Sequence, residues 1–355
     1  MSEIAIIGGG AWGTGLAIAL GRKGTHRVRM WVYEKEVCDS INQRHENEIF
    51  LRGQRIPEAV RATNSLQETL RGAEIVVSVM PSHHVRRVFR EMQPHLGAEM
   101  LFVSATKGLE NETLLRVTEV IREVLGVRAH DTGAPSKPGF GLLGWRGFDP
   151  RIAALSGPSF AQEVARGDPT AITIASRDAG LAQRVQADFS DPSFRVYTND
   201  DVTGVEMGGA LKNIIAIAAG VCDGLGLGHN SVAALITRGL AEITRLAVAS
   251  GARRDTMAGL SGMGDLVLTC TGGLSRNRTV GVELGRGRKL SEIIAGMHGM
   301  VAEGVLTTNA AVDLACKSRV EMPITQQMHA ILHQGKPPRD AIHELMTRPG
   351  KGENL

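Results

Sequence analysis

Short apolar runs alternate with amphipathic stretches over the first 198 residues of the chain. The runs are rich in isoleucine, valine and other apolar residues, which is typical of strands buried on both faces of a parallel sheet. Strands that alternate with helices predict a doubly wound α/β sheet, whose ligands bind beyond the carboxyl ends of the strands. The runs lie at 3–8, 27–33, 74–80, 99–104, 151–155, 170–176 and 194–198.

Beyond residue 198 the apolar positions follow a helical period instead. The stretch from Thr203 to Asn230 has almost no polar face, and glycine-rich breaks divide the helices after it. We therefore expect a dinucleotide-type sheet domain over 1–198 and an all-helical domain over 199–355. A Gly- and Pro-rich segment at about 130–149 is interpreted as an inserted loop. It either folds over a site or packs against a second subunit in a homodimer.

Two local expectations concern the segments between the strands. A helix is expected over 35–44, and the polar stretch at 45–57 after it is expected to be an irregular loop. Ser82 directly follows Pro81 and precedes the helix expected around 85–92. Because serine is a preferred N-cap residue, Ser82 is expected to cap that helix.

A glycine-rich turn follows the first strand. Gly8, Gly10 and Gly13 have the G-x-G-x-x-G spacing, an apolar helix comes next, and Glu34 ends the second strand. In this context the first glycine permits the turn, the second admits a pyrophosphate to the backbone, and the third lets helix pack on strand. The pyrophosphate then meets the positive end of the helix. The sequence therefore predicts a Rossmann-type dinucleotide site.

Glu34 bears on which nicotinamide dinucleotide is used. A carboxylate here accepts hydrogen bonds from a ribose 2′-hydroxyl and repels a 2′-phosphate, although the neighbouring Lys35 softens that repulsion. The pattern favours NAD without excluding NADP. The alternative is that Glu34 is a solvated residue that opens the next helix.

Lys212 stands in the middle of the apolar helical stretch. Desolvation disfavours an ammonium among small and apolar residues, so its pKa should fall toward neutrality unless a carboxylate opposes the shift. A lysine of that kind exchanges protons at physiological pH. The alternative is a lysine that pairs with an acid in a core. Its neighbours at helical spacing are Gly208, Gly209, Ile215 and Ala216.

Three further segments carry candidate chemistry. Asp265 follows a Ser-Gly-Met-Gly turn, and it either caps a helix or orients Lys212. Arg276 lies between Ser275 and Asn277, a set that suits bidentate phosphate binding; the alternative is a surface charge. At the end of a predicted strand, Lys107 is placed to meet a phosphate or cofactor, or is a solvated turn lysine.

The segment Ser156–Ala161 (SGPSFA) forms a second strand–glycine–helix turn, with hydroxyls at its mouth. Such a turn suits an anion, and it is also compatible with an ordinary capped helix start.

Composition narrows the class further. A net charge of +3 without runs of like charge does not indicate a nucleic-acid binder. The four cysteines and eleven histidines show no metal or disulfide spacing, and no secretory signal opens the chain. The apolar run after Lys212 is interrupted by glycines, so we expect no membrane span. A cytoplasmic enzyme without a metal is the expectation.

Over nearly its whole length the chain resembles NAD(P)-dependent sn-glycerol-3-phosphate dehydrogenases. The stretch WVYE followed by NQRHEN is similar to NAD-using eukaryotic members, and Ala11 stands where many bacterial members have serine. The segment at 130–149 departs from the family. The segments that carry the resemblance are IAIIGGGAWGTGLA, SATKGL, SGPSFA, GGALKNIIAIAAGVCDGLGLG, GMGDLVLTCTGG, SRNR and VAEG.

The resemblance implies that Lys212 accepts the proton when glycerol 3-phosphate is oxidised and donates it when dihydroxyacetone phosphate is reduced. Asp265 and Asn213 hold that ammonium and the substrate, and the product supplies glycerophospholipid synthesis. Implied substrate contacts are Lys107, Gly157, Ser159, Lys212, Asn213, Asp265, Ser275, Arg276 and Asn277. Implied NAD(P) contacts are Gly8, Gly10, Ala11, Trp12, Gly13, Tyr33, Glu34, Lys107, Ala161, Arg276, Val301 and Glu303.

Two other functions remain compatible with the sequence. One is a dehydrogenase of the same two-domain plan that acts on a 3-hydroxy acid or a sugar acid. The other is a nucleotide-sensing protein without turnover. The Ser275–Arg278 cluster favours a phosphorylated substrate, and a lysine buried among glycines favours catalysis.

Overall fold

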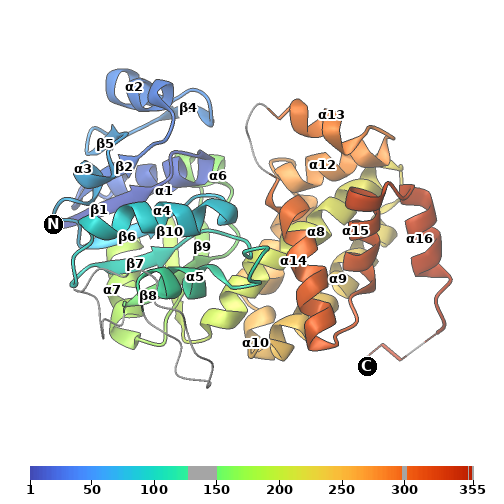
Figure 1. Ribbon diagram of the computed structural model, residues 1–355. Coiled ribbons are helices and arrows are strands. Elements are labelled where there is room, and N and C mark those ends of the chain that lie inside the picture. Colours follow the sequence, from blue (N-terminus) through green and yellow to red (C-terminus); the bar gives the residue numbers. More distant parts are fainter. Residues whose placement is uncertain (127–149, 298–301, 351, 354–355) are drawn as a thin grey trace.

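The computed structural model describes residues 1–126, 150–297, 302–350 and 352–353. A sheet flanked by helices forms the first half of the chain, and helices alone follow it in the described residues (Figure 1). The predicted α/β class with a helical C-terminal half is confirmed. The predicted loop at 130–149 lies outside the described residues.

Eight strands form one sheet in the order β10-β9-β8-β7-β6-β1-β2-β5. Every neighbouring pair is parallel except β8 and β9, so β9 and β10 run against the other six strands. The strands are β1 Ser2–Ile7, β2 His26–Trp31, β5 Val60–Thr63, β6 Ile75–Ser78, β7 Leu101–Ser104, β8 Ile152–Ser156, β9 Thr170–Ala175 and β10 Phe194–Asn199.

The antiparallel step between β8 and β9 departs from the fully parallel sheet expected from the alternation. Helix α6 (Ala161–Arg166) connects the two strands and has six residues. At about 1.5 Å per residue it spans only about 9 Å, too little to carry the chain back along β8. The chain re-enters the sheet from the carboxyl edge, so Ser159 and Ala161 stay at that edge.

The strands are apolar on both faces because both faces are covered. In β1, Ile4 and Ile6 lie in one core with α1 and α7, whereas Ala5 and Ile7 lie in a second core with α4 and α5. The alternation explains why this strand reads as a continuous apolar run. The helices of this half are α1 Ala11–Arg22, α2 Lys35–Arg44, α3 Leu66–Leu70, α4 Val85–Met92, α5 Val117–Val124, α6 Ala161–Arg166 and α7 Ala179–Phe189.

Two local predictions were wrong. The stretch expected to be an irregular loop forms a small hairpin, in which β3 (Glu46–Asn47) pairs with β4 (Leu51–Arg55). Ser82 does not cap α4, because a 3₁₀ turn (Ser82–His84) intervenes and His84 occupies the N-cap position without a side-chain hydrogen bond. The sequence pattern also did not predict β5 and α3.

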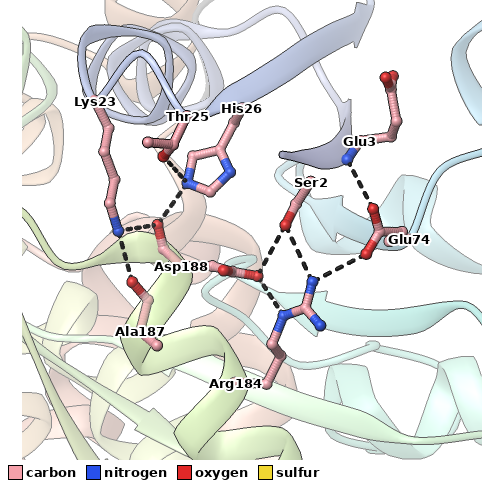
Figure 2. Close-up of polar contacts among 9 residues, drawn as sticks. All are labelled: Ser2, Glu3, Lys23, Thr25, His26, Glu74, Arg184, Ala187 and Asp188. Atoms are coloured by element: carbon pink, nitrogen blue, oxygen red, sulfur yellow. Dashed lines mark hydrogen bonds and ion pairs between the residues drawn. The ribbon is translucent and has the colours of Figure 1, made fainter.

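A polar cluster ties the amino-terminal edge of the sheet to the end of α7 (Figure 2). Lys23, just after α1, donates through Nζ to the main-chain oxygens of Ala187 (2.6 Å) and Asp188 (3.0 Å). Arg184 pairs with Asp188 and with Glu74. Cations near the last carbonyls of a helix offset its dipole, so this cluster is structural and lies at the edge opposite the strands' carboxyl ends.

Helix α8 (Val202–Gly224) leads from the sheet into the helical half and is its central element (Figure 1). Its mean hydropathy of 1.4 and its length would suffice to cross a membrane, but the whole apolar window is buried inside the protein. Around it lie α9 His229–Ala249, α10 Arg254–Met257, α11 Asp265–Thr271, α12 Arg276–Gly285, α13 Leu290–Ala295, α14 Glu303–Ser318, α15 Pro323–Gln334 and α16 Pro338–Met346.

Glycines bring the backbones of α8 and α12 into direct contact. A Cβ atom on Gly281 of α12 would lie 2.0 Å from the Ile217 main-chain oxygen, and one on Gly220 of α8 would lie 2.0 Å from the Arg278 oxygen. Gly224 and Gly285 repeat the contact one turn further on. No side chain fits between the two helices at these positions, so α8 and α12 are locked together.

Candidate active site

A cavity of about 720 Å³ lies between the carboxyl ends of the strands and the helical half. The glycine turn after β1 lines one side of it, and residues of α8, α11, α12 and α14 line the other. Ligands of open α/β sheets bind at this edge, as the alternation of strands and helices predicts.

The glycine turn begins at Gly8, which has a φ of 131°. A Cβ atom on Gly13 would lie 2.1 Å from the Gly8 oxygen, so this glycine lets α1 pack against the turn and does not line the cavity. The adjacent Trp12 lines the cavity, and its buried Nε1–H has no partner among the described residues. An indole N–H at the start of a helix is suited to an anionic ligand.

Lys212 and Asp265 meet in the buried wall formed by α8 and α11. Lys212 Nζ donates to Asp265 Oδ1 at 2.6 Å and to Thr269 Oγ1 at 2.6 Å. Gly264 occupies the N-cap position of α11 without a side-chain bond, and Asp265 is the first residue of the helix. The Asp265 carboxylate therefore orients Lys212 and does not cap the helix. The sequence had left these two roles open.

Lys107 reaches the same carboxylate from the sheet half. Its Nζ donates to Asp265 Oδ2 at 2.7 Å and to the Gly157 oxygen at 3.1 Å. The Ser159 hydroxyl donates to that oxygen as well, at 2.9 Å. Gly209 of α8 lies beside this lysine and packs against Ser156, since a Cβ there would lie 2.5 Å from Ser156 Oγ. Asp265 thus bridges two ammonium groups from opposite halves of the chain.

Burial lowers the pKa of Lys212 to about 8. The Asp265 carboxylate opposes this shift, and the Lys107 ammonium adds to it. A pKa near 8 gives Lys212 comparable amounts of ammonium and amine in weakly basic solution. The lysine can therefore both donate and accept a proton there.

The Ser275–Asn277 segment begins α12 at the cavity wall. The Ser275 hydroxyl accepts from the Arg278 amide at 3.2 Å, and Asn277 Oδ1 accepts from the Gly304 amide at 3.0 Å. Arg276 has no hydrogen bond or ion pair with any described residue, and burial lowers the pKa of its guanidinium. The Glu303 carboxyl opposes that shift without pairing with the guanidinium, so Arg276 is available to an anionic ligand.

Glu303 is the first residue of α14 and lines the cavity near this guanidinium. Burial raises the pKa of Glu303 to about 8, while the Ser82 amide and the Lys107 ammonium oppose the shift. Its Oε2 is buried and unpartnered among the residues that the structure describes. This oxygen is thus left to interact with a ligand donor.

Most residues singled out from the sequence meet in this one cavity. Gly13 and Gly157 stand behind its wall, and Val301 lies outside the described residues. Thr269 was missed, although its spacing of four residues from Asp265 places both on one helix face. The predicted residues that line the cavity are Gly8, Gly10, Ala11, Trp12, Tyr33, Glu34, Lys107, Ser159, Ala161, Lys212, Asn213, Asp265, Ser275, Arg276, Asn277 and Glu303.

Comparison with known proteins points to one family. Residues 201–343 match the NAD-dependent glycerol-3-phosphate dehydrogenase C-terminus, and residues 3–136 and 147–182 match the N-terminus of the same family. A glycerol-3-phosphate dehydrogenase [NAD(P)+] of Koribacter versatilis is 67% identical over 353 residues, 99% of each chain. That of Acidobacterium capsulatum is 54% identical, over 99% of this chain and 100% of its own.

A solved structure agrees with the sequence comparison. The crystal structure of glycerol-3-phosphate dehydrogenase from Coxiella burnetii superposes with a TM-score of 0.88 at 39% identity, over 98% of this chain and 99% of that one. Both halves of the chain, sheet and helices, are therefore covered by sequence and by structure. The chain belongs to the NAD-dependent glycerol-3-phosphate dehydrogenase family.

Proposed function

We propose that this protein interconverts sn-glycerol 3-phosphate and dihydroxyacetone phosphate with NAD(P), using Lys212 as the general acid and base. One observation carries the proposal: the Lys212 amine lines the same cavity as the glycine turn, together with the Arg276 guanidinium, which has no hydrogen bond or ion pair with any described residue. A proton donor, an anion site and a dinucleotide turn are the three parts that reduction of a phosphorylated ketone needs.

When bound, the nicotinamide would supply or accept the hydride. Lys212 would donate or accept the proton. In reduction, the Lys212 ammonium donates a proton to the carbonyl oxygen of the ketone; in oxidation, the neutral amine takes the hydroxyl proton. The Asp265 carboxylate holds Nζ in place from 2.6 Å, together with the Thr269 hydroxyl. Asn213, the next residue on α8, lines the cavity beside it and is proposed to bind the substrate oxygen.

The phosphate of the substrate is assigned to the start of α12. Arg276 would form charge-assisted hydrogen bonds to it, and the helix N-terminus adds a favourable dipole. The Ser275 hydroxyl and the Asn277 side-chain oxygen each accept a backbone hydrogen bond. The Ser275 O–H and the Asn277 Nδ2 hydrogens therefore remain available to donate to a phosphate. Lys107 and Ser159 complete the substrate side, and Gly157, which does not line the cavity, accepts hydrogen bonds from both through its main-chain oxygen.

The nucleotide is assigned to the opposite wall. Gly8, Gly10 and Gly13 shape the turn, and Ala11 and Trp12 begin the helix that meets the pyrophosphate. The proposed contacts at the remaining positions are Tyr33, Glu34, Ala161, Val301 and Glu303.

The assay that tests this function is oxidation of NADH and of NADPH with dihydroxyacetone phosphate as the second substrate. Turnover that requires the phosphorylated ketone supports the proposal. Turnover only with a 3-hydroxy or sugar acid substrate would support the related dehydrogenase instead. Cofactor binding without turnover on any of these substrates would support a nucleotide sensor.

The two directions of the reaction should respond oppositely to pH. Reduction needs the Lys212 ammonium, so its kcat should fall as pH rises through about 8; oxidation needs the amine, so its kcat should fall as pH drops through the same region. The measurement is kcat at saturating substrate in both directions. Asp265→Asn removes the carboxylate that raises the pKa of Lys212, so both profiles should move to lower pH. Profiles that stay in place in this variant would contradict the assignment.

We also propose a preference for NAD. Glu34 lies three residues after β2, at the N-cap position of α2, and lines the cavity, whereas the exposed Lys35 does not line it. Glu34→Ala should raise the kcat/KM for NADPH relative to NADH by about tenfold, because a carboxylate repels a 2′-phosphate and this repulsion is lost. Steady-state kinetics with both cofactors measures the ratio. Glu36→Ala changes the exposed second residue of α2, which does not line the cavity, and should leave the ratio unchanged; an equal effect of both variants would refute a specific role of Glu34.

Three broader proposals follow from the same fold. The division near residue 198 is supported by the last strand, which ends at Asn199, and by family matches that end at 182 and resume at 201. Reduction would supply glycerol 3-phosphate, the backbone of glycerophospholipids. The scattered cysteines are consistent with a cytoplasmic protein.

A further inference from the structure

The hairpin β3–β4 places a buried amide against the glycine turn. Asn47 is fully buried, and its Nδ2 donates to the Gly9 oxygen and to Thr14 Oγ1, both at 2.8 Å. Its Oδ1 accepts from the Phe50 amide at 3.0 Å. A carbonyl can only accept and a backbone amide can only donate, so these partners fix which end of the Asn47 amide is nitrogen.

The contact with Gly9 controls the geometry of the turn. The described residues contain no cis peptide bond, and in a trans peptide the C=O and the following N–H point to opposite sides. A Gly9 carbonyl held by Asn47 therefore turns the Gly10 N–H away from the hairpin. Both Gly9 and Gly10 line the cavity. On the other side of the turn, Val32 leaves no room for a side chain at Gly9.

The same amide connects the turn with a second wall of the cavity. The Phe50 amide donates a hydrogen bond to Asn47, and Phe50 lines the cavity together with Leu51 of β4. Strand β4 also packs against α1 and α6. One buried side chain thus joins the backbone of the glycine turn to the apolar wall beside it.

We propose that Asn47 is a positioning residue for the dinucleotide, which holds the Gly9–Gly10 peptide so that the Gly10 N–H is available to the pyrophosphate. It touches no substrate atom and acts through the turn. The inference rests on the proposed function, because it concerns binding of that cofactor.

The chain offers a matched control in Asn42. This residue of α2 makes a similar amide clasp, with Nδ2 donating to the Ala62 oxygen at 2.8 Å and Oδ1 accepting from the Ala62 amide at 3.0 Å. Ala62 belongs to β5, and neither residue lines the cavity. Substitution of Asn42 therefore tests loss of a similar clasp without any effect on the turn.

The experiment measures NADH affinity of the full-length protein by fluorescence titration, with thermal unfolding recorded for each variant. Asn47→Ala should weaken NADH binding by roughly ten- to hundredfold, because the Gly9 oxygen keeps only the longer bond from the Thr14 hydroxyl, at 3.4 Å, and that hydroxyl loses its donor. Asn42→Ala should bind within about twofold of the unsubstituted protein. The kcat of Asn47→Ala at saturating NADH should stay near that of the unsubstituted protein, since the substrate end is untouched.

Asn47→Asp gives an independent readout. A carboxylate cannot donate to the Gly9 oxygen, so NADH binding should be weak at about pH 8.5. Burial raises the pKa of such a carboxyl, and once protonated it donates one hydrogen bond. Affinity should therefore recover at about pH 6, relative to the unsubstituted protein at each pH, whereas Asn42→Asp should show no such recovery.

Two results would overturn the inference while leaving the proposed function intact. One is a folded Asn47→Ala that binds NADH as tightly as Asn42→Ala. The other is an NADH affinity of Asn47→Asp that does not recover at lower pH. This result decides the question if the alanine variant does not fold. Failure of the unsubstituted protein to bind either NADH or NADPH would instead overturn the proposed function, and this inference with it.

Discussion

Lys212→Ala should lower the kcat for reduction of dihydroxyacetone phosphate by on the order of 10²–10⁴-fold, while NADH binding survives. The reason is local: Lys212 Nζ is the proposed proton donor, and it is buried and held by Asp265 and Thr269 at 2.6 Å. Stopped-flow or steady-state oxidation of NADH measures the loss, and a fluorescence titration checks the binding. A variant with near-normal turnover would exclude the acid–base role.

Two companion variants separate proton transfer from charge and from folding. Lys212→Arg keeps a cation but cannot release a proton at these pH values, so oxidation of glycerol 3-phosphate should stay impaired. Lys23→Ala removes a lysine from the opposite edge of the sheet, where its Nζ donates to two main-chain oxygens at the end of α7 (Figure 2). It should affect stability and leave kcat unchanged.

Arg276→Ala should raise the KM for dihydroxyacetone phosphate by on the order of a hundredfold, the scale expected when one partner of a desolvated charge pair is removed. Arg276 is half-buried, lines the cavity and has no partner among the described residues. The matched control is Arg278→Ala, two residues further along α12, because Arg278 pairs with Asp223 at 2.8 Å and does not line the cavity.

A substrate without phosphate sharpens that test. Dihydroxyacetone lacks the group assigned to Arg276, so its kcat/KM should be low for the unsubstituted protein and little changed in Arg276→Ala. An equal loss with both substrates would show that the arginine supports the site in general and does not bind phosphate.

The sequence predicted those parts of the site that depend on local spacing. The glycine turn, the acid after the second strand and the lysine of α8 each follow from a short pattern. The pairing of Lys212 with Asp265 joins positions 53 residues apart, and only the resemblance to a family indicated it firmly. Gly208 and Gly209, which the sequence places beside Lys212 at helical spacing, let α8 pack closely against Ser261 and Ser156.

Other features depend on packing and were not predictable in this way. Strand β9 runs antiparallel to β8 because α6 is short. The residue types in the run at 170–176 do not indicate the direction of the strand. The hairpin that carries Asn47 is polar and brief, so it lacks the periodicity that marks a strand. Its significance comes from a contact with Gly9, 38 positions away, which appears only in the folded chain.

The glycine contacts between α8 and α12 fix the distance between the residues that these two helices place in the cavity. Lys212, the proposed proton donor, belongs to α8, and Arg276, the proposed phosphate ligand, belongs to α12; the backbones of these two helices touch. Any hinge motion between sheet and helices would carry amine and guanidinium together and alter only their approach to the nicotinamide. In the proposed mechanism, selection of a ketone by its distance from the phosphate would thereby be separated from delivery of the hydride. A homologue one carbon longer would fit poorly between Lys212 and Arg276, however far the halves close.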